Sequence, residues 1–496
     1  MNFPCIRWRR ALLRSWLLSL LPLCTPAPLA AQYSVPLRTL GSIREDRVRM
    51  GQLTGGSTAG TLLRIGGDVD SAPGGLRVLR PEMRFTHQSQ LPAPDNDGAL
   101  WSGRGPNVLL RAGVTVGAGP LRITVAPELA YSTNEPFEVR SATVAGRSAF
   151  ASPWRSAEAP ADLPVRFGDQ QVAVLLPGQS VAALRFSSVT VGMMTGNLWW
   201  GPGLRNALVL SDHASGIPRL TVRTTTPRRT PLGDLEGELF VGRLTESPYF
   251  DDEPSNDHRR IKALALTLAP RGVPGLTLGA GGLVISRDQM ATAFFRWVVP
   301  EAGVEFWGEY ARQRLPASPR EMFTQPNADM GWTAGAQWLL PPSHGAWRFQ
   351  LEFSDVAQSL VDPSRPPRDW GTGATVNHGF TQRGQLLGPA TGPGSTTGWF
   401  AADRVQSGWS LGAFAARTRW ENDAFYRQRI INFFAHDVSL IGGVRAHWRT
   451  LFLDLSSSLG WERRFNYQFE NGTIVPNNRG QRTYDNLRLS LAITPR

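Results

Sequence analysis

The chain has 496 residues, and its 52 lysine and arginine residues against 40 aspartate and glutamate residues give a formal net charge of +12. Beyond residue 31, no window contains the roughly 20 consecutive apolar residues that a membrane-spanning helix needs, so helical membrane insertion is excluded there. Both cysteines, Cys5 and Cys24, lie in the first 31 residues, so the remainder has neither a thiol nor a disulfide.

Residues 1–31 have the layout of a secretory signal peptide. Four arginines precede the apolar run at 15–24 (SWLLSLLPLC), and small residues occupy positions 30 and 31. Leu23 precedes Cys24, where a lipoprotein signal requires a small residue, so we expect cleavage without lipidation. The four arginines carry four of the twelve net charges, so the expected mature chain keeps +8. An exported protein is not expected to bind nucleic acid. Its net positive charge then favours anionic lipid or acidic sugars as partners.

Residues 32–105 are expected to form a periplasmic helix or plug and a lead-in segment. The run 42–45 (SIRE) is a capping box, and Val48 and Leu53 follow it before Gly55 and Gly56. This pattern predicts one short helix. The alternative is a disordered leader.

From residue 106 to residue 496 the dominant signal is alternation of apolar and polar residues with a period of two. The segment 347–354 (WRFQLEFS) has one apolar and one polar face, and 487–494 (LRLSLAIT) repeats this pattern. We predict sixteen strands, with 76–87 and 382–387 as candidates for more. The sixteen lie at 108–116, 120–130, 180–195, 219–227, 233–245, 259–269, 275–286, 293–299, 303–313, 332–341, 346–357, 397–407, 410–420, 437–448, 450–462 and 483–495.

Three features favour a membrane barrel over a water-soluble sandwich. The polar faces hold small residues and acids, which a water-filled lumen tolerates. The apolar faces place tryptophan and phenylalanine near strand ends, and short connections alternate with long ones. The predicted fold is therefore all-β: a transmembrane antiparallel β-barrel of 16–18 strands in the outer membrane, with a short N-terminal periplasmic segment.

Spaced motifs between residues 160 and 410 carry a family resemblance. They include 164–169 (PVRFGD), 197–203 (NLWWGPG), 306–310 (FWGEY) and 378–388 (HGFTQRGQLLG). In their order these motifs resemble the Wzi capsule-assembly family of outer-membrane proteins. The resemblance implies a monomeric barrel that acts as a lectin and holds capsular polysaccharide on the cell surface. This chain departs from the family in its short helical leader, and its last residues, 494–496, lack the aromatic end of many outer-membrane barrels.

The stretch 196–220 contains most of the candidate binding residues. Indole faces stack on sugar rings, and amide, imidazole and guanidinium groups bond their hydroxyls and carboxylates. In the alternative interpretation, which we favour for at least one of the two tryptophans, the Gly-Pro-Gly turn folds a loop inward and the indoles wedge it against the barrel wall. The residues expected to bind carbohydrate are Trp199, Trp200, Arg205, Asn206, His213 and Arg383.

Three patterns suggest chemistry, and each has a simpler explanation. Ser211, Asp212 and His213 are adjacent, so on a strand they point to opposite faces and form no relay. The glutamates at 236, 238, 305 and 309 are interpreted as lumenal charges balanced by arginines and not as glycosidase pairs. The acidic loop at 251–257 lacks the spacing of a calcium loop. We expect no enzyme activity, no catalytic residue, no metal and no cofactor.

These observations predict a lectin-like outer-membrane protein that binds and retains capsular or extracellular polysaccharide. The alternative is a substrate-selective channel for sugars or anions, because a barrel of this size leaves a wide lumen unless it is plugged. The other expected partners are outer-membrane lipid, lipopolysaccharide and the barrel-assembly machinery. The chain is expected to be a monomer.

Overall fold

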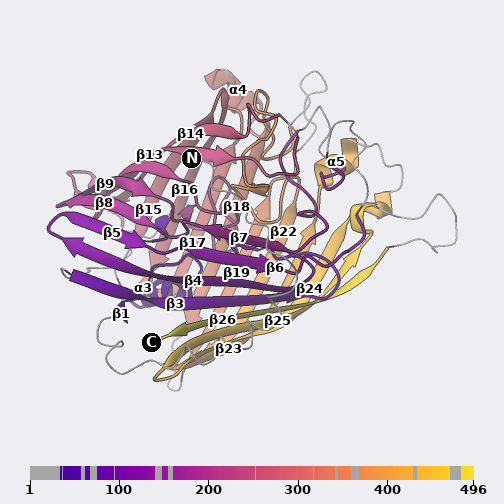
Figure 1. Ribbon diagram of the computed structural model, residues 1–496. Helices are drawn as coiled ribbons and strands as arrows, with labels where there is room; N and C mark the ends of the chain where they lie inside the picture. Colours follow the sequence, from indigo (N-terminus) through magenta and orange to yellow (C-terminus); the bar gives the residue numbers. More distant parts are fainter. Residues whose placement is uncertain are drawn as a thin grey trace.

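The structure is a computed structural model, and it is described here for residues 34–35, 37–56, 62–67, 75–93, 95–139, 148–154, 160–251, 253–316, 318–340, 345–358, 368–427, 433–469 and 482–496. The expected signal peptide lies outside these residues. Within them, twenty-two strand segments form one sheet that closes into a barrel (Figure 1). One segment adds in parallel at the edge of the first barrel strand, and three barrel strands are each broken into two segments. Eighteen antiparallel barrel strands result, which confirms the predicted fold and its 16–18 strands.

The barrel strands follow one another around the wall in chain order. They are β3 (Gly75–Gln88), β4 (Gly105–Ala118), β5 (Leu121–Val125) with β6 (Glu128–Ser132), β7 (Val172–Leu176) with β8 (Val181–Phe186), β9 (Val189–Met194), β11 (Arg219–Thr224) with β12 (Arg228–Arg229), β13 (Gly233–Thr245), β14 (His258–Pro270), β15 (Leu276–Ile285), β16 (Asp288–Val299), β17 (Val304–Arg312), β18 (Met330–Leu340), β19 (Ala346–Asp355), β22 (Thr396–Val405), β23 (Trp409–Arg419), β24 (Val438–Arg449), β25 (Leu453–Phe465) and β26 (Tyr484–Pro495). The remaining elements are β1 (Ser34–Val35), α3 (Ile43–Gln52), β2 (Leu63–Ile65), β10 (Leu198–Trp200), η2 (Pro300–Ala302), α4 (Pro319–Thr324), β20 (Thr381–Gln382), β21 (Gln385–Leu386), α5 (Asn422–Arg427), η3 (Phe433–Ala435) and η4 (Tyr467–Phe469).

Closure joins the last strand to the first. Strands β26 and β3 pair antiparallel from Arg488 opposite Gln88 to Ile493 opposite Met83. The barrel therefore begins at Gly75 and not at residue 106, where the sequence analysis placed its start, although 76–87 was a candidate strand. A register shift between Leu79 and Glu82 interrupts the period of two in β3, which weakens the sequence signal there.

Other strand assignments also differ from the prediction, and β7 was not among the predicted strands. The segment 180–195 is two strands, β8 and β9, joined by a tight turn in which Ser187 has φ 49°. The candidate 382–387 forms the small hairpin β20–β21, whose two strands pair only with each other and are not strands of the wall. A two-residue turn and a short hairpin both fall below the length that periodicity resolves.

The outer face of the barrel is apolar and has aromatic residues near both ends of the strands. In membrane barrels, tryptophan side chains near the strand ends lie at the interface between lipid and water. Trp409 and Trp448 pair directly across β23 and β24, and Tyr310 pairs with Trp332 across β17 and β18 at the opposite end. The exposed belt near the short turns consists of Trp297, Trp338, Trp347, Trp409 and Trp448. None of the helices in the described ranges has the length and apolar character needed to span a bilayer.

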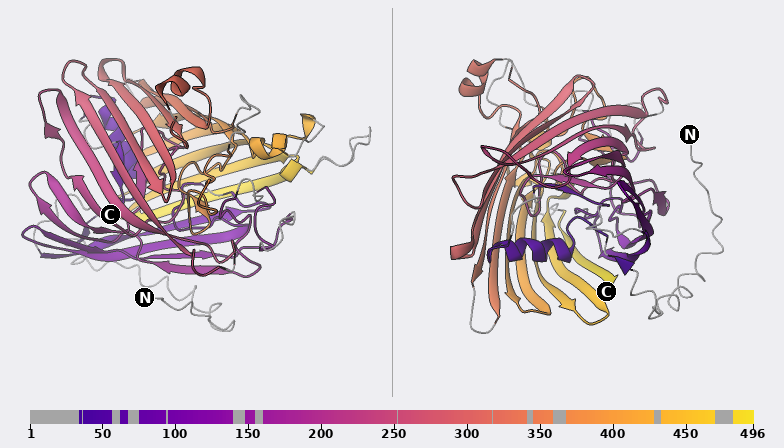
Figure 2. Two further views of the ribbon diagram at one scale, coloured as in Figure 1. Left: turned by 90° about the horizontal axis from the view of Figure 1, so that it is seen from above. Right: turned by 90° about the vertical axis from the view of Figure 1, so that its left-hand side faces the viewer.

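The two ends of the barrel differ. Short turns at 119–120, 187–188 and 406–408 lie at the end that also holds the C-terminus, which we call the short-turn end (Figure 2). The long connections, among them 133–171, 313–329 and 420–437, lie at the other end, which we call the long-loop end. The capping-box helix is present as α3: Ser42 Oγ accepts a hydrogen bond from the Glu45 amide, and Gly41 donates to the Glu45 carboxylate. It lies across the barrel near the short-turn end.

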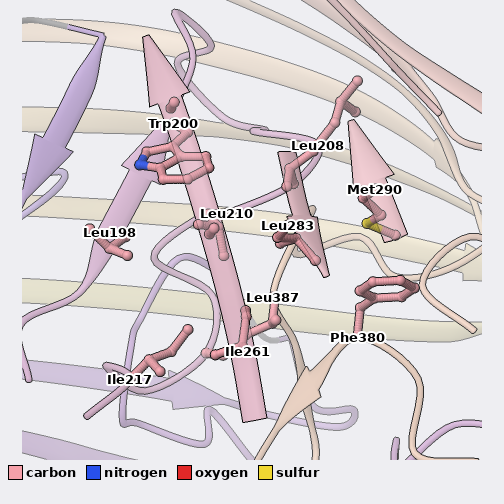
Figure 3. Close-up of a cluster of buried hydrophobic side chains, with 14 of the residues drawn as sticks. Leu198, Trp200, Leu208, Leu210, Ile217, Ile261, Leu283, Met290, Phe380 and Leu387 are labelled. Carbon is pink, nitrogen blue, oxygen red and sulfur yellow. The ribbon is translucent and has the colours of Figure 1, made fainter. Parts of the chain in front are cut away.

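Four segments of the chain fill the barrel interior, and we call them the plug: α3, residues 62–67, residues 196–218 and residues 368–395. Trp200, Leu210 and Phe380 of the plug pack against Ile261 and Leu283 of the wall in one apolar cluster (Figure 3). The interior is therefore not uniformly polar, as the sequence analysis expected of a lumen. Much of the inner face of β13 to β16 is apolar because residues such as Phe240, Ile261, Leu283 and Phe294 pack against the plug and not against water.

Candidate functional site

The Gly-Pro-Gly turn in 196–218 has the backbone geometry that folds this segment inward. Gly201 has φ 112°, a conformation that side chains with a Cβ rarely adopt. A Cβ there would lie 2.9 Å from Glu309 Oε2, and a Cβ at Gly203 would lie 1.9 Å from the Asn206 carbonyl oxygen. The turn therefore requires glycine at both positions.

Wall carboxylates hold the plug by its backbone. The Glu352 side chain on β19 accepts hydrogen bonds from the amides of Leu204 (2.5 Å), Arg205 (2.9 Å) and Asn206 (2.9 Å). The Asp288 side chain receives three successive amides from the second loop, those of 374 (2.8 Å), 375 (2.9 Å) and 376 (2.9 Å). Bonds to an ionised acceptor are stronger than neutral ones, so each carboxylate fastens one plug loop to the barrel.

The four glutamates that suggested acid–base pairs have structural partners. Glu305 bonds to Arg49 of α3 (2.6 Å) and to Arg296 of β16 (2.7 Å). Glu309 accepts from the Leu208 amide (3.2 Å). Glu238 accepts from the Trp200 indole (3.3 Å), and Glu236 accepts from Thr267 Oγ1 (3.2 Å). The arginine balance expected from the sequence thus holds for Glu305, whereas Glu309 and Glu238 bond to the plug.

Both tryptophans of the 197–203 motif are covered. Trp200 is 0% exposed and meets Phe240 edge-on with ring centroids 5.9 Å apart. Trp199 is 3% exposed, and the Arg64 guanidinium lies over its ring at 4.5 Å. Neither indole presents a free face to a ligand in this arrangement. The wedge explanation fits Trp200, which packs against Phe240 of the wall, whereas Trp199 packs against Leu40 and Ala207, which are not wall residues. Their role in sugar binding stays a prediction that requires the plug to move.

The other four predicted residues separate into two groups. His213 is buried, and its Nδ1 lies 2.9 Å from the Asp95 carbonyl oxygen. Arg383 is exposed at the β20–β21 turn with φ 51°, and its amide donates to the Thr245 carbonyl (2.8 Å). Arg205 and Asn206 both line one cavity. The structure therefore brings two of the six residues together at an accessible place.

That cavity has a volume of ≈ 210 Å³ and lies between the plug and the wall near the long-loop end. Its aromatic side is Trp399 of β22, with the Arg205 guanidinium 5.8 Å and the Arg445 guanidinium 5.2 Å from the ring centroid. Trp420 lines the same space. The other polar groups that line it are Thr86, Gln88, Asp95, Asp97, Asn206, Thr391, Thr397, Thr418, Ser439, Ser458, Glu462, Arg488 and Ser490.

Charges in this cavity are balanced and fixed. Arg205 pairs with Asp95 at 2.5 Å, and Arg445 donates through Nε to Asp403 (2.7 Å). Burial alone raises the pKa of Asp95, but the Arg205 guanidinium outweighs it and lowers that pKa to about 2. Asp95 is therefore ionised at any pH the cell meets. An indole face, rigid guanidinium groups and many hydroxyls form the kind of surface that binds a saccharide.

Trp399 and Trp420 were not predicted to bind carbohydrate, because the predicted aromatic residues all lie in a stretch expected to be irregular. Trp399 lies in a segment correctly predicted as a strand, and Trp420 directly follows the end of another, β23. In β22 the outward residue is Phe400, so Trp399 faces inward, where an indole is unusual unless it packs or binds. The position of the plug decides which inward-facing side chains line a cavity. The alternation of residues along a strand does not show where the plug lies.

One group of possible metal ligands occurs among the described residues. Donor atoms of Glu246, Asp251 and His378 all lie within 4.8 Å of one another at the long-loop end. The His378 Nε2 also approaches Asn256 Oδ1 at 3.0 Å and contacts the Glu246 carboxylate. An Nε2–H that donates to both oxygens explains this arrangement by hydrogen bonding alone. The chemistry of the donors suits a divalent cation, but the expected absence of metal remains a prediction.

The Ser211-Asp212-His213 string forms no relay. Ser211 Oγ donates to the Gly388 carbonyl (2.5 Å) and accepts from the His213 amide (3.1 Å). His213 Nδ1 faces the backbone of residue 95 and not a carboxylate. These bonds fix the two plug loops against each other.

Acidification is expected to loosen the plug through His213. Burial lowers the pKa of His213 below its usual 6.5, so the unfolded chain binds the proton more readily. Its contribution to stability is therefore full above pH 6.5 and falls as the pH is lowered through that value. Thermal unfolding in detergent at pH 7.5 and pH 5 should show a larger loss in the natural protein than in His213→Gln. An outward-facing control, His87→Gln, should keep the full loss, and an equal loss in all three would contradict the assignment.

Comparison with known proteins bears on the fold. No family model matches the chain, and no curated protein matches it in sequence. Among solved structures, Wzi of Escherichia coli, an outer-membrane protein involved in group 1 capsule assembly and a carbohydrate-binding β-barrel, aligns with a TM-score of 0.57 at 13% identity, over 84% of each chain. OprD of Pseudomonas aeruginosa aligns at 0.43 and 10% identity over 86% of this chain and 96% of its own. OccK2 of the same organism, in complex with glucuronate, aligns at 0.42 and 11% over 84% and 98%. The chain thus has the fold of an outer-membrane β-barrel and resembles Wzi in structure.

Proposed function

We propose that this protein is a lectin of the Wzi type that binds and retains capsular or extracellular polysaccharide at the outer membrane. The observation that carries the proposal is the cavity lined by Trp399, Arg205 and Arg445, in which both guanidinium groups approach the indole, close to the long loops. Long loops of outer-membrane barrels face outward, so a polymer chain on the cell surface reaches this cavity directly. No chemistry is performed on the polymer.

Binding depends on many weak contacts along a repeating chain. The cavity holds about one or two sugar units by its volume, so each engagement is weak and the polymer gains affinity by repetition. The barrel acts as a monomer, with lipid and lipopolysaccharide around its aromatic belts and with the barrel-assembly machinery as its route into the membrane. Arg205 and Asn206 bond to sugar hydroxyls. Arg383, exposed elsewhere on the long-loop end, contacts a more distant part of the polymer.

Replacing Trp399 by alanine is expected to weaken polysaccharide binding by about tenfold, because one stacking face with its adjacent cations contributes about 1–2 kcal/mol. Purified surface polysaccharide from the same cells, titrated against the protein in detergent, gives the affinity. Trp461→Ala is the matched control, since this indole faces outward on β25 beside Arg463. Equal affinity of all three proteins would count against the cavity. In cells, unchanged shedding of polysaccharide after gene deletion would overturn the function itself.

The channel alternative requires a path past the plug. Arg445 at the cavity pairs with Asp403, Asp403 pairs with Arg348 (2.9 Å), and Arg348 pairs with Asp46 of α3 (2.7 Å). This chain of ion pairs joins the wall to the plug between the cavity and the short-turn end. The natural protein should accordingly carry little steady current in a planar bilayer, and a large one would favour the channel.

A further inference from the structure

Two cavities at the short-turn end are lined by arginines. They lie at the opposite end of the barrel from the proposed carbohydrate cavity, and Arg38 lines both. The first, of ≈ 80 Å³, has a single lining carboxylate, Glu236, and its arginines are Arg38, Arg122, Arg185 and Arg223. The second, of ≈ 180 Å³, has the single lining carboxylate Glu45, and its arginines are Arg38, Arg44, Arg49, Arg64 and Arg296.

Some of these cations have acidic partners. Arg49 and Arg296 share Glu305, which lies behind the second cavity, and Arg64 pairs with Glu45 at 3.3 Å. These pairs hold α3 in place. None of these pairs involves Arg38, Arg122 or Arg223, which line the first cavity.

Two further cations of the first cavity, Arg122 and Arg223, bond to neutral groups. Arg122 Nη1 donates to the carbonyls of Gly119 (2.9 Å) and Leu121 (2.8 Å), and Arg223 Nη2 donates to that of Leu63 (3.3 Å). Within the described part of the chain, no salt bridge joins Arg38, Arg122 or Arg223 to a carboxylate. A carbonyl satisfies a donor but does not neutralise its charge, so the positive potential of the pocket persists.

This arrangement suits an oxyanion. Guanidinium groups match the geometry of phosphate and carboxylate oxygens, and the hydroxyls of Thr115, Thr190 and Thr225 on the same cavity wall add donors. Half-buried like charges repel each other less when an anion lies among them. The long-loop cavity differs, because its three arginines face three carboxylates, at positions 95, 97 and 462. The excess of positive charge thus distinguishes these two cavities from the long-loop cavity.

We propose that the Arg38 cavities form an anion-binding site, which holds a small oxyanion or the phosphate or carboxylate group of a larger molecule. The volumes admit one such group and not a folded polymer chain. By the usual orientation of outer-membrane barrels the site faces the periplasm. It is separate from the carbohydrate cavity and does not depend on the function proposed for that cavity.

The test is titration of the full-length protein, in a non-ionic detergent at low ionic strength, with inorganic phosphate and, separately, with glucuronate. Tight binding of either ligand is expected, and the tighter one identifies whether phosphate or carboxylate is the preferred group. Arg38→Gln should weaken binding by about tenfold, since it removes a charge-assisted donor from both cavities. Arg463→Gln is the matched control: this arginine is exposed at the long-loop end and pairs with Asp485 at 3.0 Å. It should bind like the natural protein.

A second variant covers the case in which Arg38→Gln fails to fold. Arg122 donates to carbonyls of its own turn, so Arg122→Gln leaves the plug contacts intact and should still lower the affinity severalfold. Absence of binding in the natural protein overturns the proposal, and so does an affinity unchanged in both variants. Trp399→Ala separates the two sites: it should leave phosphate and glucuronate binding unchanged, and a loss of both there would place the anion in the carbohydrate cavity.

Discussion

Glu352→Ala is expected to release the first plug loop and to lower the stability of the folded barrel by about 3 kcal/mol. Three backbone amides, those of residues 204–206, lose their acceptor together; two are half-buried and that of Asn206 is buried. An unsatisfied donor costs about 1–3 kcal/mol when it is buried. Relief of the buried carboxylate's own desolvation offsets part of that sum. The expected decrease in the free energy of unfolding is therefore smaller than the sum for three independent hydrogen bonds.

Two measurements check the effect of Glu352→Ala. The unfolding midpoint in detergent should fall, and the current through a planar bilayer should rise because the loose loop opens a path for ions. Glu352→Gln, which keeps one acceptor oxygen, should show a smaller change in both. Glu301→Ala, at an exposed position on η2, is the control and should match the natural protein. A destabilised variant with no added current would mean that other plug segments close the lumen by themselves.

Trp200→Ala is expected to destabilise the barrel by about 3–5 kcal/mol, the usual cost of truncating a large buried aromatic side chain. Trp200 is fully buried among plug and wall residues, and its indole donates to Glu238. Truncation leaves a cavity and an unsatisfied acceptor. Trp199→Ala should cost less, because the flexible Arg64 side chain that covers Trp199 can relax into the space.

The same variants decide between the two explanations of the tryptophan pair. The wedge explanation predicts a lower unfolding midpoint and, in the fraction that stays folded, unchanged polysaccharide affinity. The stacking explanation predicts the reverse: a normal midpoint with lost affinity. Trp461→Ala, on the outer face, controls for the loss of an indole as such. A normal midpoint in Trp200→Ala would contradict the packing described here.

Part of the site was accessible to sequence reasoning. The 197–203 motif located the segment that folds inward, and Arg205 and Asn206 within it do line the loop-end cavity. Two wall residues of that cavity, Trp399 and Arg445, were not among the predicted carbohydrate-binding residues. They are far from the motif in sequence and adjoin it only because β22 and β24 lie on the side of the barrel that the plug leaves open.

The sequence by itself determined the wall of this protein. A period of two repeats along each strand because side chains alternate between lipid and interior, and this local rule can be read without knowing any partner. The helix at 43–52 could also be predicted from local sequence, because the four consecutive residues of its capping box are enough to mark its start. Only the tertiary structure decided what fills the barrel. Carboxylates on β16 and β19 meet plug amides from segments 86 to 148 residues away, and no periodic pattern encodes contacts at such separations. The burial of Trp199 and Trp200, the place of the carbohydrate cavity and the arginine excess at the short-turn end all follow from those long-range contacts.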